Sequence, residues 1–434
     1  MRIFIRGAYN LYNFGDDLIL GAIIFFLENT IKFRGEIFLQ PNEYNSFAKL
    51  GLRCELPLRY GIDIESMLKE KNARLKRLNF PKVFRIFILV SYLVFLILDV
   101  AIFRIARRSI SHREFISFYK NIDVIHYAGG GYITDRWKRR LLYEFLTLKV
   151  AKLINPRIHV IGTGMGIGPF HSAVFLTICK YFLSMFDYLF LREMQSYYLA
   201  KKLVPSISAE CYGDDVLLLL PELEKLAQQV KKRDYLGVNL KDFPDHKYER
   251  VINQLETILQ QAIEYGIVPH YFCFGEKPGP DDISLLDSCS EIKRFIRYVH
   301  SPYQEGFHQF MRNIARVKVG IGFAYHFNVV LRLLKIPTIA IYQGKYYEQK
   351  IKGVLQDVMC WHLVKGVDEF TDRAEAIFRD VLNVNAELSN DIAAVKVKKA
   401  YNDMISAYQR AYRAMVKTMG RATKYPEEQI KQER

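Results

Sequence analysis

The sequence contains few cysteines, and their positions suit neither disulfide bonds nor zinc. Six cysteines are spread over 434 residues, without a Cys-x-x-Cys pair and without a cysteine–histidine spacing that fits a zinc site. No other cluster of metal ligands is evident, so we expect neither a metal nor a cofactor. Scattered cysteines of this kind are typical of reduced thiols in the core of a cytosolic protein.

A signal for export, an internal repeat and a low-complexity tract are also missing. The first residues, MRIFIRGAYN, place a glycine and an asparagine soon after a short apolar run. That pattern is typical of a buried first strand followed by a loop, and not of a signal peptide. We therefore expect the protein to remain in the cytoplasm.

Acidic residues are outnumbered by basic ones. The chain has 62 lysines and arginines against 46 aspartates and glutamates, which gives a net charge of +16. Such an excess indicates an acidic partner, which can be nucleic acid, anionic lipid or a phosphorylated substrate. The positive charge is densest beside a long apolar run, and not beside a recognition helix or interleaved stacking aromatics. We therefore expect no nucleic acid among the partners.

Short apolar runs alternate with longer helical patterns, which is typical of βαβ units and parallel sheets. At about 150 residues per domain, the length suits two domains with additions. We predict an α/β protein with Rossmann-like domains at 1–227 and 235–385, a helix at 386–419 and a solvated tail at 420–434. Strands are expected near 2–6, 36–40, 123–127, 158–162 and 188–191, and near 236–240, 268–274, 296–300, 317–321 and 338–342. The helices expected between them include those near 194–203 and 303–314.

A basic and apolar segment, residues 69–113, interrupts the first half. Seven basic residues lie between Lys69 and Arg85, the 13-residue apolar run Ile86–Leu98 follows, and Asp99 interrupts it before further arginines. A spanning helix needs about 20 apolar residues. We interpret the segment as a helix that lies on an anionic membrane surface. A buried core helix and a tilted span remain the alternatives.

Glycine-rich turns follow several predicted strands. Gly15 and Asp16 lie at a helix start, where Asp16 can cap the helix, accept a proton or bind a sugar hydroxyl. A second turn contains Gly129, Gly130 and Gly131, and a third runs from Gly162 to Pro169 and includes Gly164, without the Gly-Lys-Ser/Thr of a Walker loop. Because ligands bind at the carboxyl ends of parallel strands, we expect both halves to line one cleft.

Charged side chains also follow predicted strands. Arg192 suits either a surface ion pair or a clamp on a carboxylate, and Asp214 can cap a helix or line the cleft. In the second half, His326 begins a helix behind a glycine turn, and Lys345 and Lys350 follow in a cluster with tyrosines. A histidine at a helix start is commonly structural, but beside such a cluster it becomes a site candidate.

In this order, the motifs resemble those of the polysaccharide pyruvyl transferase family. They are Asn13–Asp16, Gly129–Gly131, Gly162–Pro169, Arg192–Ser196 and the block Gly322, His326, Pro337 and Lys350. The resemblance covers residues 1–357 apart from the basic apolar insertion. One position departs from the family pattern, because Ala324 stands where the family usually has an arginine thought to hold the donor. Arg192, Arg332 and the two lysines are the candidates to replace that charge.

The resemblance implies a GT-B-like pair of Rossmann-like domains and transfer of pyruvate from phosphoenolpyruvate to a sugar as a cyclic ketal. We expect His326 to act on the phosphate or as general acid, and Asp16 as the base for the sugar hydroxyl. The donor is expected at Lys350, Lys345, Arg192, Gly129, Gly130, Gly131 and Gly164, and the acceptor at Asn13, Tyr132 and Asp214. The acceptor is expected to be a polyprenyl-linked oligosaccharide of a cell-surface glycan, at the inner face of the membrane.

Two other functions suit the same sequence. A glycosyltransferase with a nucleotide-sugar donor would explain Ala324, because such a donor needs no carboxylate clamp. A non-catalytic membrane scaffold of polysaccharide assembly would explain the basic apolar insertion without any donor site.

Overall fold

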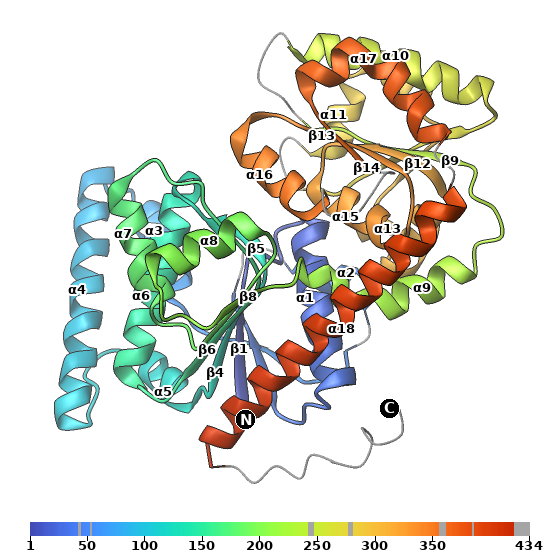
Figure 1. Ribbon diagram of the computed structural model, residues 1–434. Coiled ribbons are helices and arrows are strands. Elements are labelled where there is room, and N and C mark those ends of the chain that lie inside the picture. The colour runs from blue at the N-terminus through green and yellow to red at the C-terminus, as the bar shows by residue number, and fades with distance from the viewer. Residues whose placement is uncertain are drawn as a thin grey trace, which may run out of the picture.

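Two parallel sheets, each with helices on both faces, form the protein (Figure 1). The computed structural model describes residues 1–41, 45–52, 54–241, 247–276, 281–355, 362–383 and 386–420. The tail predicted beyond residue 420 and Cys360 lie outside the described residues. The elements follow the predicted alternation of strand and helix, because buried apolar runs form the strands and amphipathic stretches form the helices between them.

The first sheet has the strand order β3-β2-β1-β4-β6-β7-β8, with β5 beside β6. Its strands are β1 (Arg2–Arg6), β2 (Glu36–Leu39), β3 (Leu58–Tyr60), β4 (Val124–Tyr127), β5 (Gly130–Ile133), β6 (His159–Ile167), β7 (Tyr188–Leu191) and β8 (Ala209–Cys211). Its helical elements are α1 (Phe14–Phe25), η1 (Phe26–Thr30), α2 (Ser46–Lys49), α3 (Ile64–Arg77), α4 (Lys82–Ala106), α5 (Arg113–Asn121), η2 (Asp135–Trp137), α6 (Lys138–Ile154), α7 (Ala173–Leu183), α8 (Met194–Leu203), η3 (Asp215–Leu219) and α9 (Leu220–Gln228).

The second sheet has the order β11-β10-β9-β12-β13-β14. Its strands are β9 (Tyr235–Asn239), β10 (Val268–Phe272), β11 (Tyr298–His300), β12 (Val317–Gly322), β13 (Thr338–Tyr342) and β14 (His362–Gly366). Its helices are α10 (Lys247–Glu264), α11 (Asp282–Asp287), α12 (Ser290–Lys293), α13 (Pro302–Glu305), α14 (Phe307–Ala315), α15 (Tyr325–Leu333), α16 (Gly344–Leu355) and α17 (Val367–Leu382). The helix predicted near 303–314 is two helices, because Gly306 has a φ of +77° and separates α13 from α14.

The prediction of glycine turns at 129–131 and 162–169 was wrong. Gly130 and Gly131 begin strand β5, and β6 continues through Ile167. Glycine is needed here because neighbours press against the strands: a methyl group added to Gly164 would lie 2.7 Å from Cγ of Asp215, and one added to Gly129 would lie 3.0 Å from Oδ2 of the same carboxyl. These residues pack around Asp215 and do not form an anion-binding loop.

Helix α18 (Ala386–Thr418) follows the second domain and crosses back over the first (Figure 1). Its Tyr408 hydroxyl donates to Oδ1 of Asp215 at 2.7 Å, and its Tyr412 hydroxyl lies 2.7 Å from Nδ1 of His126. Thr163 links these two groups, because its hydroxyl donates to Asp215 and lies 2.7 Å from Nε2 of His126. A buried polar chain therefore fastens the last helix to the first sheet.

The buried polar chain around Asp215 predicts that the stability of the protein depends on pH. Burial, together with the charge of Asp214, raises the pKa of Asp215 from 3.8 to about 7. The folded state then holds a proton that the unfolded state has lost, so the unfolding free energy falls as the pH rises from about 4 to 7, at up to about 1.4 kcal/mol per pH unit for one group. In Asp215→Asn, the melting temperature measured by calorimetry should depend less on pH between pH 5 and 8 than it does in the wild type. Parallel curves for the two proteins would contradict this account.

Helix α4 forms the apolar part of the basic apolar segment. It is the one helix in the described part of the chain that is long and apolar enough to cross a bilayer. One face packs on the first domain through Leu96, Val100 and Phe103, and the Asp99 carboxylate, also on that face, accepts hydrogen bonds from the backbone N–H groups of residues 110–112. Phe87 and Phe95, on the other side, are 70% and 64% exposed. The helix is therefore packed on the first domain along one face and exposed along the other.

Candidate active site

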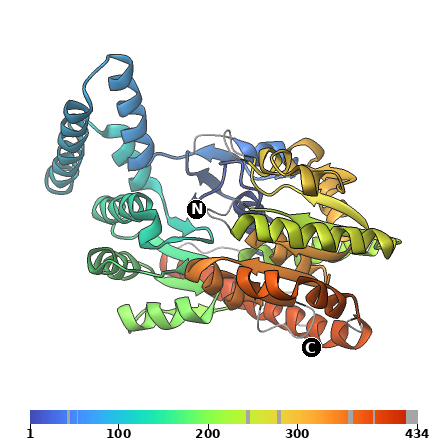
Figure 2. The same ribbon diagram turned by 90° about the horizontal axis from the view of Figure 1, so that it is seen from above.

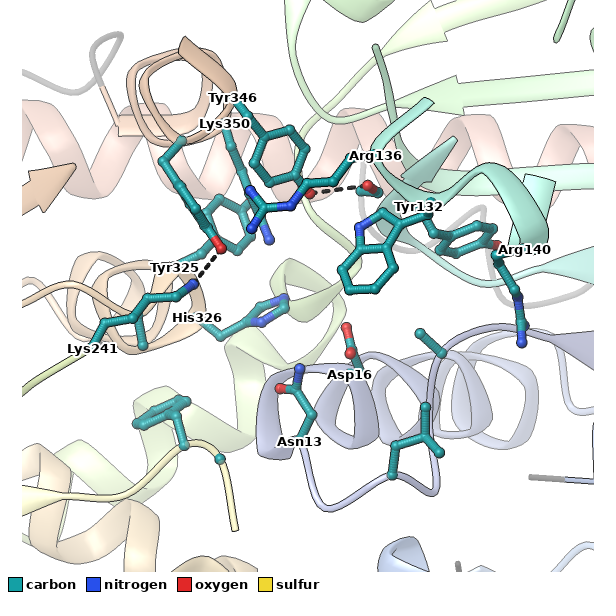
Figure 3. Close-up of a pocket in the computed structure, with 18 of the residues that line it drawn as sticks. Asn13, Asp16, Tyr132, Arg136, Arg140, Lys241, Tyr325, His326, Tyr346 and Lys350 are labelled. Carbon is teal, nitrogen blue, oxygen red and sulfur yellow. Dashed lines mark hydrogen bonds between the residues drawn. The ribbon is translucent and has the colours of Figure 1, made fainter. Parts of the chain in front are cut away.

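One cavity of about 920 Å³ lies between the two domains, at the carboxyl ends of their strands (Figure 3). The first domain contributes Asn13 and Asp16 after β1 and Tyr132 in β5. The second domain contributes His326 after β12 and Lys350 of α16. The prediction that loops of both halves would line one cleft is confirmed.

The two domains touch at the bottom of this cavity, in the loop that follows β1. The Phe14 N–H donates to the carbonyl of Phe274 at 2.9 Å, next to a bridge between Asn13 and Gly275. Asp17 is buried here and accepts a hydrogen bond from the Tyr303 hydroxyl of the second domain at 2.7 Å. Of the two adjacent acids, Asp17 therefore joins the domains, whereas Asp16 lines the cavity.

The His326 ring lies directly on the first turn of α1. A methyl group added to Gly15 would lie 1.8 Å from Nδ1 of His326, so only glycine allows this approach. On the other side, Nε2 lies 3.7 Å from Oδ2 of Asp214. The ring is 6% exposed and forms part of the cavity wall. A histidine of the second domain is thus held between two elements of the first.

Asp214 is a buried anion behind His326 and lies outside the cavity lining, so the structure does not place it on the acceptor side. Its carboxylate accepts hydrogen bonds from the Tyr325 hydroxyl at 3.0 Å and from the Val216 N–H at 3.0 Å. Burial alone would raise the pKa of Asp214, but His326 and Arg192 lower it to about 2. The group stays ionised and stabilises a positive charge on the imidazole.

Lys350 brings a cation into the same wall. Its Nζ lies 4.4 Å from the centre of the Tyr325 ring, and it lines the cavity. Burial, with the nearby charge of Arg192, lowers the pKa of Lys350 from 10.5 to about 7. Lys345, the other predicted lysine, is exposed at the start of α16 and lies outside the lining.

Arg192 lies one layer behind the cavity. Its Nε is paired with Glu193 at 2.6 Å, and Glu193 in turn accepts from Ser196 at 2.5 Å, which accounts for the Arg-acid-x-x-Ser motif. Its guanidinium lies 4.9 Å from the Tyr325 ring, and its Nη1 has no hydrogen-bond partner among the described residues. Gly131 of the cavity wall lies beside Nη2, because a methyl group added there would lie 3.0 Å from that nitrogen.

The glycines predicted to bind the donor have different positions. Gly131 lines the cavity, and its carbonyl accepts from the Tyr346 hydroxyl at 2.9 Å. Gly129, Gly130 and Gly164 lie outside the lining and serve the packing of β5 and β6 described above. Of the predicted acceptor residues, Asn13 and Tyr132 line the cavity.

Several cations of the cavity wall were missed, and Arg136 and Lys241 are two of them. Arg136 lies 5.3 Å from the Tyr346 ring and 5.4 Å from the Tyr347 ring, and Lys241 lies 2.5 Å from the Tyr347 hydroxyl. Arg136 begins the run Arg-Trp-Lys-Arg-Arg shortly after the glycine triplet, and this run after a strand was the signal that could have indicated it. Both lie on the cavity that Ala324 also lines, so they can replace the charge absent at 324. Arg332, a candidate from the sequence, lines a separate cavity beside α18.

Known structures share this architecture at low sequence identity. The UDP-GlcNAc 2-epimerase of Neisseria meningitidis superposes with a TM-score of 0.54 at 10% identity, over 96% of this chain and 100% of that one. The enzyme of the same name from Methanocaldococcus jannaschii gives 0.52 at 14% identity, over 89% and 94%. The trehalose 6-phosphate synthase of Burkholderia multivorans gives 0.50 at 10%, over 98% and 99%. No curated protein sequence matches the chain.

These comparisons and the cavity between two Rossmann-like domains define a GT-B-type fold. The sequence profile of the polysaccharide pyruvyl transferase family matches residues 13–344. The chain therefore belongs to the polysaccharide pyruvyl transferase family and is a transferase with a polysaccharide acceptor, as the ordered motifs predicted.

Proposed function

We propose that the protein transfers the pyruvyl group of phosphoenolpyruvate to a sugar as a cyclic ketal. The observation that carries the proposal is the composition of the cavity wall. It unites a histidine backed by an ionised aspartate with three cations, which are Lys350, Lys241 and Arg136. A small donor with a phosphate and a carboxylate matches such a set of charges.

The donor lies, on this proposal, between α16 and η2. Lys350, Lys241 and Arg136 hold its phosphate and carboxylate, and the aromatic rings of Tyr346 and Tyr347 keep the cations in place. Arg192 adds positive charge from behind Gly131 and orients Tyr325. Lys350 and Lys241 are partly buried, so their charges act more strongly than they would in water, whereas Arg136 is exposed.

The reaction needs one proton on carbon and two new C–O bonds. His326, in its charged form, donates a proton to the methylene carbon of the donor, which leaves positive charge at the adjacent carbon. One sugar hydroxyl attacks that carbon, phosphate leaves with the C–O electron pair, and a second hydroxyl of the same sugar closes the ketal. One of the two hydroxyl protons restores His326, and the other leaves with the phosphate. Asp214 stabilises the imidazolium.

Asp16 is the base for the sugar hydroxyl on this proposal. It lies in the first turn of α1 and lines the cavity together with Asn13, on the same side as the His326 ring (Figure 3). Asn13 and Tyr132 lie beside the sugar. The acceptor is a sugar of a polyprenyl-linked oligosaccharide, which the enzyme meets at the cytoplasmic face of the membrane. No metal or cofactor takes part.

A donor screen tests the proposal. Purified full-length protein is incubated with phosphoenolpyruvate, or with nucleotide-sugars, and a panel of lipid-linked oligosaccharides, with and without EDTA, and products are identified by mass spectrometry. We expect release of phosphate and a product heavier than the acceptor by one pyruvate minus water, unchanged by EDTA. A glycosylated product formed from a nucleotide-sugar would contradict the proposal.

A further inference from the structure

The outer part of the cavity carries cations that the donor does not need. Lys69 of α3, and Lys138 and Arg139 of α6, line the same cavity as His326. We call these three residues the basic rim. Lys138 and Arg139 are exposed and form no ion pair with any described residue, whereas Lys69 pairs with Glu65 at 2.9 Å.

Helix stability does not explain Lys138 and Arg139 of the basic rim. The first turn of α6 contains no acidic residue, although Lys138 and Arg139 lie there. Cations in the first turn of a helix are repelled by its dipole, and they repel each other. Their position is unfavourable for the helix alone and becomes favourable when an anion is bound at the mouth of the cavity.

An exposed apolar surface lies on α4, which contacts the helix of Lys69. Helix α3, which carries Lys69, packs on α4, and both project as a pair from the edge of the first domain (Figure 2). Apolar side chains recur every three or four residues along the outward surface of α4, and they are largely exposed: Val83, Phe87, Val90, Val94, Leu98 and Ile102. Arginines and lysines flank both ends of the helix. This pattern is that of a helix lying in the surface of an anionic bilayer.

Two ion pairs, one partly buried and one fully buried, hold α3 to α6 and to the first sheet. Arg140 of α6 pairs with Glu65 of α3 at 3.1 Å. Asp63 caps the start of α3 and lies 3.4 Å from the buried Arg6 of β1. Because α3 is held to both α6 and the sheet, a bilayer in contact with α4 would always lie at the same place relative to the cavity mouth.

We infer that the basic rim binds the diphosphate of a lipid carrier whose hydrocarbon chain stays in an anionic bilayer contacted by α4. The sugar next to that diphosphate then enters the cavity toward Asp16, while the carrier remains in the membrane. The inference rests on the proposed function for the sugar. The site itself follows from the cavity lining, the unpaired cations and the exposed apolar surface of α4.

Vesicle binding tests this inference with the full-length protein. Phosphatidylcholine vesicles contain either polyprenyl diphosphate or phosphatidylserine at equal surface charge. We expect the wild type to bind the diphosphate vesicles at least about tenfold more tightly, and inorganic pyrophosphate to compete for this difference only. Lys138→Gln/Arg139→Gln should remove the preference. The matched control Lys398→Gln/Lys399→Gln, which removes two exposed charges from α18, should keep it.

A second variant tests the bilayer contact. Phe87→Ser/Phe95→Ser changes only exposed side chains and should abolish binding to both kinds of vesicle. A preserved diphosphate preference in the rim variant, or undiminished vesicle binding in the α4 variant, would overturn the inference. The inference would also be overturned if Phe87→Ser/Phe95→Ser only converted a dimer to a monomer. That result would mean that a second copy of the chain covers α4 in the wild type. Calorimetry with phosphoenolpyruvate separates the two proposals: a wild type that does not bind it contradicts the proposed function and leaves the rim result standing.

Discussion

Replacing His326 with glutamine is expected to lower kcat about a thousandfold and to leave the affinity for phosphoenolpyruvate nearly unchanged. Glutamine keeps the size and a hydrogen-bonding end, but it cannot deliver a proton to the methylene carbon. Asp214→Asn should lower kcat less, by about ten- to a hundredfold, because it removes the charge 3.7 Å from Nε2 and one of the two hydrogen-bond acceptors but leaves the imidazole in place. Single-turnover kinetics and calorimetry with the donor measure both effects.

Gly15→Ala tests the same site from the other domain. The new methyl group would lie 1.8 Å from Nδ1 of His326, so the ring must move, and kcat should fall nearly as far as in His326→Gln. Gly366→Ala is the matched control, because its methyl group would come no closer than 3.5 Å to Tyr342. If His326→Gln or Gly15→Ala retains near-normal turnover with an intact fold, His326 does not act in the reaction.

The second large effect concerns Lys350 and pH. Burial and the charge of Arg192 lower the pKa of Lys350 to about 7, and a lysine is charged only below its pKa. As the pH rises above 7, the donor site loses the positive charge of Lys350, so kcat/KM for phosphoenolpyruvate should fall by about tenfold per pH unit. Below pH 7 Lys350 is charged, so its titration should not change kcat/KM with pH.

Two substitutions separate this effect from other titrations. Lys350→Arg keeps a charge at every pH, so its kcat/KM should fall less steeply above pH 7 than that of the wild type. Lys350→Met should lower kcat/KM about a hundredfold at pH 6, with a smaller change at pH 9. The titration of the donor phosphate is common to all three proteins, so it cancels when their kcat/KM values are divided by one another. An alkaline decline that is identical in the wild type and in Lys350→Arg would exclude Lys350 as its cause.

Much of the fold could be predicted because strand and helix patterns are local. The strand Thr338–Tyr342 and the helix Met194–Leu203 coincide with the prediction residue for residue. The short strands β3 and β14 were missed, since three or five residues carry too little periodicity, and β5 was taken for a glycine turn. The glycine segments were misread because glycine marks both tight turns and strands that pack closely, and only the neighbouring Asp215 decides between them.

The candidate site was predicted in part for the same reason. Asn13, Asp16, Tyr132, His326 and Lys350 all follow strands or lie in a marked cluster, and the structure brings all five into the lining of one cavity. Arg136 and Lys241 carry no motif of their own, so their place in the wall depends on how η2 and the loop after β9 face each other. Asp214 was assigned to the acceptor side, but it lies behind His326 because it caps η3.

The sequence by itself determined the two parallel sheets, the family and the residues that follow the strands, because apolar periodicity and short ordered motifs are properties of the chain alone. The tertiary structure decided which charges meet. Domain contact placed His326 on Gly15 and beside Asp214, and the packing of α3 on α4 put the basic rim next to an exposed apolar surface. Distances between residues that are more than a hundred positions apart depend on how whole domains pack, and no local pattern encodes them.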